Sequence, residues 1–175
     1  NQYYLIKNKN LDFNFKNMNN MKIYYKDHMA KLWFEYLLHK NNINSKNIID
    51  DIEKIKKEKN LIFNTFFNKN SIAIIAKDLY DDMLELNPQI KEKIVILEKS
   101  KTIFFRALGF TRNGLNKEKQ DILLEMTDIL NGDDTNFNVL NFIQIQKIFH
   151  LKNEELNQTD EFFDEYFKLK KSKDL

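Results

Sequence analysis

The chain has 175 residues, of which 42% are hydrophobic and 13% aromatic, so it can bury a sizeable core as one domain or two small lobes. It contains no Cys, which excludes a disulfide framework and a thiolate metal site. The formal net charge is only +2, with Lys and acidic residues interleaved, so the electrostatic footprint of a nucleic-acid-binding protein is missing.

The elements expected along the chain are helices, because one Pro and three Gly argue against a turn-rich β architecture. Residues 1–22 are Asn-rich, with Leu11, Phe13 and Phe15 alternating with polar residues, and we expect an irregular arm there. Apolar residues at helical spacing then predict helices over roughly 24–39, 45–57, 61–67, 71–86 and 88–108.

Two runs within these helices are interpreted as structural. The Lys-rich run from Lys54 to Lys59 is interpreted as a solvated helix face rather than a phosphate-binding track. The apolar run from Ile72 to Ala76 ends at Lys77, well short of a membrane span. We therefore expect no membrane-spanning segment.

The segment from Thr102 to Phe149 predicts a helix-loop-helix unit. One helix ends near Leu108 and breaks at Gly109, and a second places Ile122, Met126 and Ile129 on one face. A polar loop over 131–136 follows, and a further apolar face then opens. After it, residues 153–171 predict a last helix, which brings the expected total to about eight helices.

This arrangement resembles the calmodulin superfamily, and within it centrins and myosin light chains most. The resemblance includes the run Phe-Arg-Ala-Leu-Gly-Phe at 105–110 and the run Phe-Asn-Val-Leu-Asn-Phe at 137–142. The resemblance covers residues 103–149 and implies an all-α fold of degenerate EF-hand-like helix-loop-helix pairs. The expected organisation is an irregular N-terminal arm over 1–22, an N-terminal helical lobe over 23–87, and a C-terminal EF-hand-like lobe with a terminal helix over 88–175.

Calcium binding is not expected at this hand. A calcium loop needs oxygen ligands at five positions and a bidentate Glu at the last. Those positions fall on Leu130, Gly132, Asp134, Asn138 and Asn141. A register that starts at Asp128 places Val139 at the last position and is no better. The three His residues have no metal-type spacing, so we expect no metal site and a calcium-independent protein.

No arrangement of residues in the sequence indicates catalysis, since there is no Cys, no Ser within a nucleophile motif and no Gly-rich phosphate loop. The candidate site is instead an apolar groove between paired hands, which in light-chain-like proteins grips a partner helix. Its expected lining is Phe104, Phe105, Leu108, Ile122, Met126, Ile129, Phe137, Phe142, Ile145 and Phe149. The alternative is a closed core in which these side chains pack against one another and leave no groove.

The resemblance therefore implies a non-catalytic, calcium-independent interaction subunit that grips an amphipathic helix of a larger protein, as a light chain or cytoskeletal adaptor. We expect no cofactor, no nucleic acid partner and a cytoplasmic location. A helical structural subunit of a larger assembly, with residues 1–22 as a docking arm, is the first alternative. An enzyme or a helical regulatory domain with unrecognised active residues is the second.

Overall fold

The computed structural model describes residues 2–18, 21–103, 115–132, 148 and 153–172. The chain divides into two compact units, one formed by Asn1–Phe105 with Asn157–Leu175 and the other by Arg106–Leu156. The division at residues 22 and 87 expected from the sequence stays a prediction.

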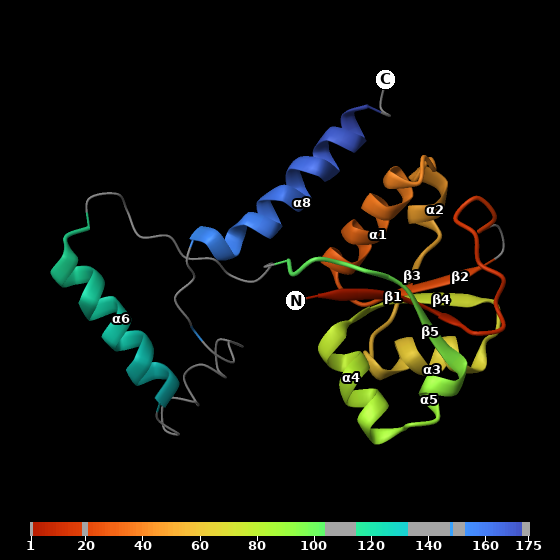
Figure 1. The fold of residues 1–175 in the computed structure, drawn as a ribbon, viewed down its shortest axis with the longest axis horizontal. Helices are drawn as coiled ribbons and strands as arrows, with labels where there is room; N and C mark the ends of the chain where they lie inside the picture. The colour runs from red at the N-terminus through yellow and green to blue at the C-terminus, as the bar shows by residue number, and fades with distance from the viewer. Residues whose placement is uncertain (1, 19–20, 104–114, 133–147, 149–152, 173–175) are drawn as a thin grey trace. The chain divides into compact units, whose positions relative to one another are not determined.

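The first unit is built on a five-stranded sheet with the order β3-β2-β4-β1-β5 (Figure 1). Its strands are β1 (Tyr3–Asn8), β2 (Lys22–Tyr25), β3 (Glu53–Lys54), β4 (Ser71–Ala76) and β5 (Ile94–Lys99). Strand β2 runs parallel to both β3 and β4, whereas β1 runs antiparallel to β4 and β5. The sheet is therefore mixed, with β1 as its only antiparallel member among the described strands.

Helices connect these strands on both faces of the sheet (Figure 1). They are α1 (His28–Lys40), α2 (Lys46–Asp50), α3 (Lys59–Phe67), α4 (Lys77–Leu86) and α5 (Ile90–Lys93). Helix α8 (Asn153–Lys171) comes after the last described strand. Helix α6 (Lys117–Gly132) belongs to the second unit. Helices α1 and α2 lie on one side of the sheet, and α3, α4 and α5 lie on the other.

Strand β4 shows why this sheet forms. Its sequence Ser-Ile-Ala-Ile-Ile-Ala is rich in β-branched residues, which suit a pleated strand. Ile72 and Ile74 pack toward α1, while Ala73 and Ile75 pack toward α3 and α4. Because helices cover both faces, the strand is apolar from Ile72 to Ala76 and shows no alternation with polar residues.

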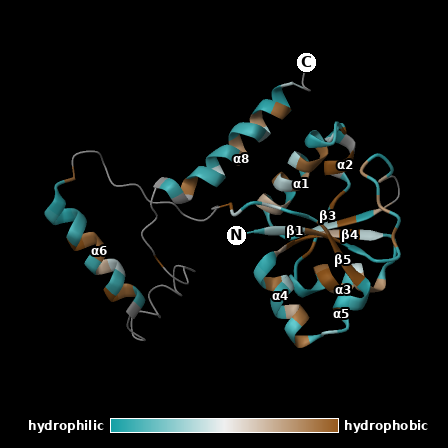
Figure 2. Cartoon of the chain, in the orientation of Figure 1, coloured by the Kyte–Doolittle hydropathy of each residue, from teal (hydrophilic) through white to brown (hydrophobic). Residues whose placement is uncertain are grey.

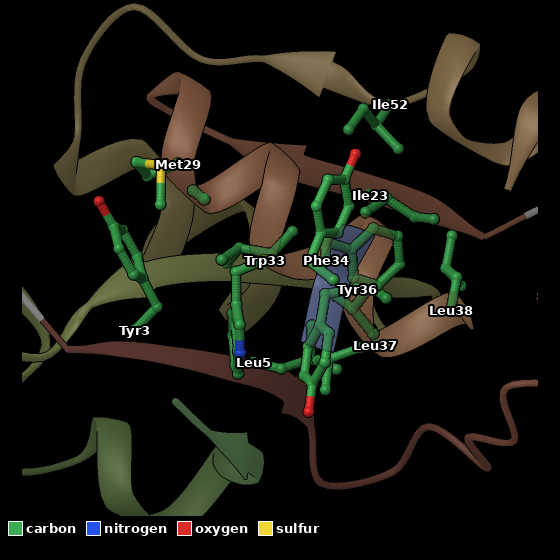
Figure 3. Close-up of a cluster of buried hydrophobic side chains, with 14 of the residues drawn as sticks. Tyr3, Leu5, Ile23, Met29, Trp33, Phe34, Tyr36, Leu37, Leu38 and Ile52 are labelled. Carbon is green, nitrogen blue, oxygen red and sulfur yellow. The ribbon is translucent and has the colours of Figure 1, made fainter. Parts of the chain in front are cut away.

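The core on the α1 face is aromatic. Figure 3 shows Trp33 and Phe34 of α1 beside Tyr3 and Leu5 of β1, and Trp33 is 2% exposed. The ring of Tyr3 stacks on Trp33 with centroids 6.4 Å apart. Phe162 of α8 belongs to the same cluster, so the terminal helix completes this layer.

The core on the opposite face joins α3, α4 and α5 to the sheet. Leu61 and Ile62 of α3 are 1% and 0% exposed, and they pack with Tyr4 of β1 and Ile94 of β5. Figure 2 shows strongly hydrophobic residues on α3 and β5, in agreement with this packing. Burial on both faces accounts for most of the apolar content of the first 100 residues.

The all-α fold class expected from the sequence is wrong, because the described chain contains a five-stranded mixed sheet. The helix expected over 71–86 is β4 followed at once by α4, and the one expected over 88–108 contains α5 and then β5. The segment expected to be an irregular arm contains β1, and the first expected helix begins as β2. The reason is that a strand buried on both faces has no period-2 pattern to distinguish it from a buried helix.

Helices α1, α3, α6 and α8 agree in whole or in large part with the sequence prediction. Residues 61–67 lie within α3, and the terminal helix expected over 153–171 matches α8 at both ends. The region expected over 45–57 as one helix is a short helix, α2, followed by the edge strand β3.

Candidate binding edge of the sheet

The connections from β2 and β4 diverge at the carboxyl ends of these strands. Strand β2 continues into α1 on one face of the sheet, whereas its neighbour β4 continues into α4 on the other. In open α/β sheets, ligands bind outside the carboxyl ends of the strands at such a switch point. We name residues 26–28, 56–59, 76–78 and 99–101 the carboxyl edge, because they follow β2, β3, β4 and β5 or end them.

The turn between β2 and α1 is held by Asp27. Its side chain caps α1, since Oδ1 accepts a hydrogen bond from the backbone N–H of Ala30 over 2.9 Å. The same oxygen accepts from the hydroxyl of Tyr3 over 3.1 Å. The amino end of β1 and the start of α1 are therefore fixed to one carboxylate.

The turn between β4 and α4 differs, because the N-cap residue of α4 is Ala76 and supplies no side-chain bond. The backbone N–H of Lys77 donates to the carbonyl oxygen of Gln2 over 2.8 Å. The Lys77 side chain forms an exposed ion pair with Asp81 at 2.6 Å, which raises the pKa of Lys77 above its usual value. An uncapped helix start carries partial positive charge, so α4 presents this charge at the edge.

The end of β5 is fixed by Ser100. Its Oγ accepts a hydrogen bond from the backbone N–H of Tyr3 over 2.8 Å and donates to the carbonyl of Lys101 over 2.6 Å. The side-chain amide of Gln2 also donates to the Ser100 carbonyl over 2.8 Å. These hydrogen bonds fix the backbone conformation of the carboxyl edge, and with it the positions from which its side chains project.

Positive charge collects at this edge. The carboxyl edge carries seven lysines, Lys26, Lys56, Lys57, Lys59, Lys77, Lys99 and Lys101, against three carboxylates of its own, Asp27, Glu58 and Asp78. Two of the lysines, Lys77 and Lys101, form ion pairs with Asp81 and Glu161, which lie outside the edge. The whole chain has a net charge of only +2, so the excess here is local. Lys26 Nζ donates to the carbonyl of Lys56 over 2.6 Å, which joins the turns after β2 and β3. An edge of this kind favours an anionic ligand.

The sequence reasoning missed this edge. Lys56 and Lys57 were expected on a solvated helix face, but they lie in the turn between β3 and α3. The lysines come from four turns far apart in the sequence, so only the order of the strands brings them to one side of the sheet. A search for lysines directly after buried apolar runs would have found Lys77.

The apolar groove residues expected from the sequence are described only in part. Ile122, Met126 and Ile129 lie on α6 and are 49%, 52% and 56% exposed. The other seven, Phe104, Phe105, Leu108, Phe137, Phe142, Ile145 and Phe149, lie outside the described residues. The grouping of these ten residues stays a prediction.

Two further features concern metals and membranes. Within the described ranges, no group of three or more His, Asp or Glu residues could hold a metal ion. None of the helices that the structure describes is long and apolar enough to cross a membrane.

Comparison with known proteins gives the fold but no family. No family model matches the chain, and no curated protein matches its sequence. XAC2383 from Xanthomonas citri bound to ATP aligns with a TM-score of 0.62 at 12% identity, over 97% of this chain and 67% of that one. The same protein bound to chloride ion aligns with a TM-score of 0.61 at 11% identity, over 98% and 66%.

A binding protein component of an ABC phosphonate transporter from Pseudomonas aeruginosa aligns with a TM-score of 0.48 at 14% identity, over 98% of this chain and 68% of that one. The chain thus spans about two thirds of the length of these structures. At this identity, the similarity to XAC2383 shows a shared fold.

These findings correct the resemblance to the calmodulin superfamily. A mixed α/β fold shared with XAC2383 is not the paired helix-loop-helix fold of centrins or myosin light chains. The predicted function of a light-chain or cytoskeletal subunit that grips a helix is therefore wrong. The short motifs at 105–110 and 137–142 carried the resemblance, and local apolar spacing of that kind occurs in many folds.

Proposed function

We propose that this chain is a non-catalytic binding domain that takes a small phosphate-bearing anion at the carboxyl edge of its sheet. The observation that carries the proposal is the excess of lysines at the switch point, where α1, α3 and α4 begin. Backbone N–H groups at a helix start and lysine side chains are both suited to phosphate oxygens.

The comparison structures support an anionic ligand. XAC2383 has been solved with ATP and with chloride ion, and both are anions. The low identity does not transfer individual ligand contacts, so the residues proposed here come from this chain alone. We assign phosphate binding to Lys26, Lys56 and Lys77 with the first turn of α4.

Lys77 can serve this role although it is paired with Asp81. The pair is exposed, and exposed ion pairs of this spacing contribute little to stability. A bound phosphate would draw Lys77 away from Asp81 at small cost. The absence of a nucleic-acid partner stays a prediction. The cytoplasmic location also stays a prediction.

Titration calorimetry with ATP and with inorganic phosphate tests the proposal. We expect saturable ATP binding that weakens with rising salt, because phosphate contacts exchange for counterions. The triple variant Lys26→Ala, Lys56→Ala, Lys77→Ala should bind ATP at least about tenfold more weakly, a loss of about 1.4 kcal/mol. Lys69→Ala is the matched control, since Lys69 is exposed in the turn before β4.

Two results would contradict the proposal. The first is an absence of saturable binding of both ATP and phosphate at low salt. The second is ATP binding that the triple variant retains at full strength, which would place any anion site away from the carboxyl edge.

A further inference from the structure

A wide-open hollow of about 520 Å³ lies at the opposite end of β2 from the carboxyl edge. It is lined by Lys22, Tyr24, Glu53, Phe63, Asn64, Phe67 and Asn68. The hollow shares no residue with the anion site proposed above, so a ligand bound here would be separate from the anion.

The strand register explains why the hollow exists. Strand β3 has only two residues, and it pairs with β2 only at Tyr24 and Tyr25. The end of β2 at Lys22 therefore has no neighbouring strand on that side among the described residues. Phe63 and Phe67, one turn apart on α3, line this gap.

Three polar side chains converge on the hollow from the sheet. Lys22 and Tyr24 are two residues apart on β2 and so project from the same face, and Glu53 lies directly beside Tyr24 in the ladder. Tyr24 is 5% exposed, so its ring forms part of the packed wall of the hollow. In the described part of the chain, the side chains of Lys22 and Glu53 form no hydrogen bond and no ion pair, with each other or with other residues.

The charges around the hollow are of both signs. The carboxylate of Glu53 favours a cation. The aromatic walls add to this preference, because a ring face attracts an ammonium group. Lys22 favours a carboxylate. An ammonium, a carboxylate and an apolar group on one small molecule would therefore be complementary to these three features.

We infer that this hollow binds a free α-amino acid with an apolar or aromatic side chain. Glu53 binds the ammonium group, Lys22 binds the carboxylate, and Phe63 and Phe67 contact the side chain of the amino acid. The inference goes beyond the anion site at the carboxyl edge and does not depend on it.

Binding measurements with three related probes test the inference. L-phenylalanine carries both charges, N-acetyl-L-phenylalanine lacks the ammonium, and L-phenylalaninamide lacks the carboxylate. The full chain should bind L-phenylalanine saturably and each derivative at least about tenfold more weakly, because each leaves one charged side chain without its partner. Titration calorimetry or ligand-observed NMR measures these affinities.

Single variants assign each charge. Glu53→Gln should weaken L-phenylalanine binding and abolish the preference over the N-acetyl derivative, while the preference over the amide remains. Lys22→Met should do the reverse. Both residues are exposed, so circular dichroism should show an unchanged fold. Glu58→Gln and Lys69→Met, which change exposed charges outside the hollow, are the controls and should behave as the unmodified chain.

Two outcomes would overturn the inference. One is the absence of saturable L-phenylalanine binding, or equal binding of all three probes. The other is loss of L-phenylalanine binding in the Lys26, Lys56 and Lys77 triple variant, because this would place the amino acid at the carboxyl edge. If ATP binding fails but L-phenylalanine binding shows the predicted pattern, the function proposed for the carboxyl edge is wrong and the hollow still stands as a site.

Discussion

The hydroxyl of Tyr3 donates a hydrogen bond to Asp27 Oδ1 over 3.1 Å, and the same oxygen caps α1 by accepting from the N–H of Ala30. One carboxylate thus ties the start of the first strand to the start of the first helix, across 24 positions of sequence. The bond lies at the carboxyl edge, so it also orders the backbone beside the proposed anion site.

Removing either partner of this bond should destabilise the chain. Tyr3→Phe should lower the free energy of unfolding by about 0.5–1.5 kcal/mol, the usual value of one hydrogen bond. Asp27→Ala should cost about 0.5–2 kcal/mol, because it also removes the helix cap. Urea denaturation of both single variants and the double variant measures the coupling. Losses that simply add would show that the two side chains do not interact.

Trp33 should be among the most sensitive positions in the core. It is 2% exposed and stacks on Tyr3, so Trp33→Ala should lower the free energy of unfolding by about 3–5 kcal/mol. Phe67 is 76% exposed, and Phe67→Ala should change the free energy of unfolding by less than about 0.5 kcal/mol. Similar losses in the two variants, measured by chemical denaturation, would contradict the described core.

Helix α8 should depend on Phe162 rather than on Phe167. Phe162 is 6% exposed and its ring meets that of Tyr36 edge-on with centroids 5.3 Å apart, whereas Phe167 is 53% exposed. Phe162→Ala should therefore cost about 3–5 kcal/mol, and Phe167→Ala less than about 0.5 kcal/mol. Hydrogen exchange of the α8 amides should rise in the first variant. An equal rise in both would mean that α8 packs with a different face.

Packing of α8 on α1 should weaken at alkaline pH. Burial, and then the hydrogen bond that Tyr36 donates to Glu165 over 2.9 Å, raise the pKa of Tyr36 from 10.0 to about 12. Because the pKa of Tyr36 is higher in the folded chain than its unfolded value of 10.0, the protonated phenol contributes its full stabilisation below pH 10. This contribution is lost as the pH rises through about 12. The ionised phenol cannot donate to Glu165 and is repelled by it.

Tyr36→Phe isolates this effect. The variant should be less stable than the unmodified chain at neutral pH, and the difference between the two should shrink between pH 10 and 12. Chemical denaturation at a series of pH values measures it, with tyrosinate absorbance as an independent record of ionisation. A difference that stays constant over this range would show that Tyr36 makes no protonation-dependent contact.

Some features of this protein follow from its sequence alone. The absence of Cys, the near-neutral charge and the apolar content needed for a packed core are properties of composition. Helices α3 and α8 were also predictable, because each is a local amphipathic pattern that needs no information about distant residues. Which face of α8 is buried depends on the tertiary structure, since Phe162 and Tyr166 are buried whereas Phe167 is exposed.

The sheet and both candidate sites were decided only by the tertiary structure. Strand β4 is apolar on both faces because helices cover it on both sides, so its sequence has neither the period of an exposed strand nor a break before α4. The strand order then places Lys26, Lys56 and Lys77 on one edge of the sheet, and the shortness of β3 leaves the hollow between Lys22 and Phe67. The lysine-rich edge and the hollow both depend on pairing between strands far apart in the chain. Local residue spacing does not determine which strands pair.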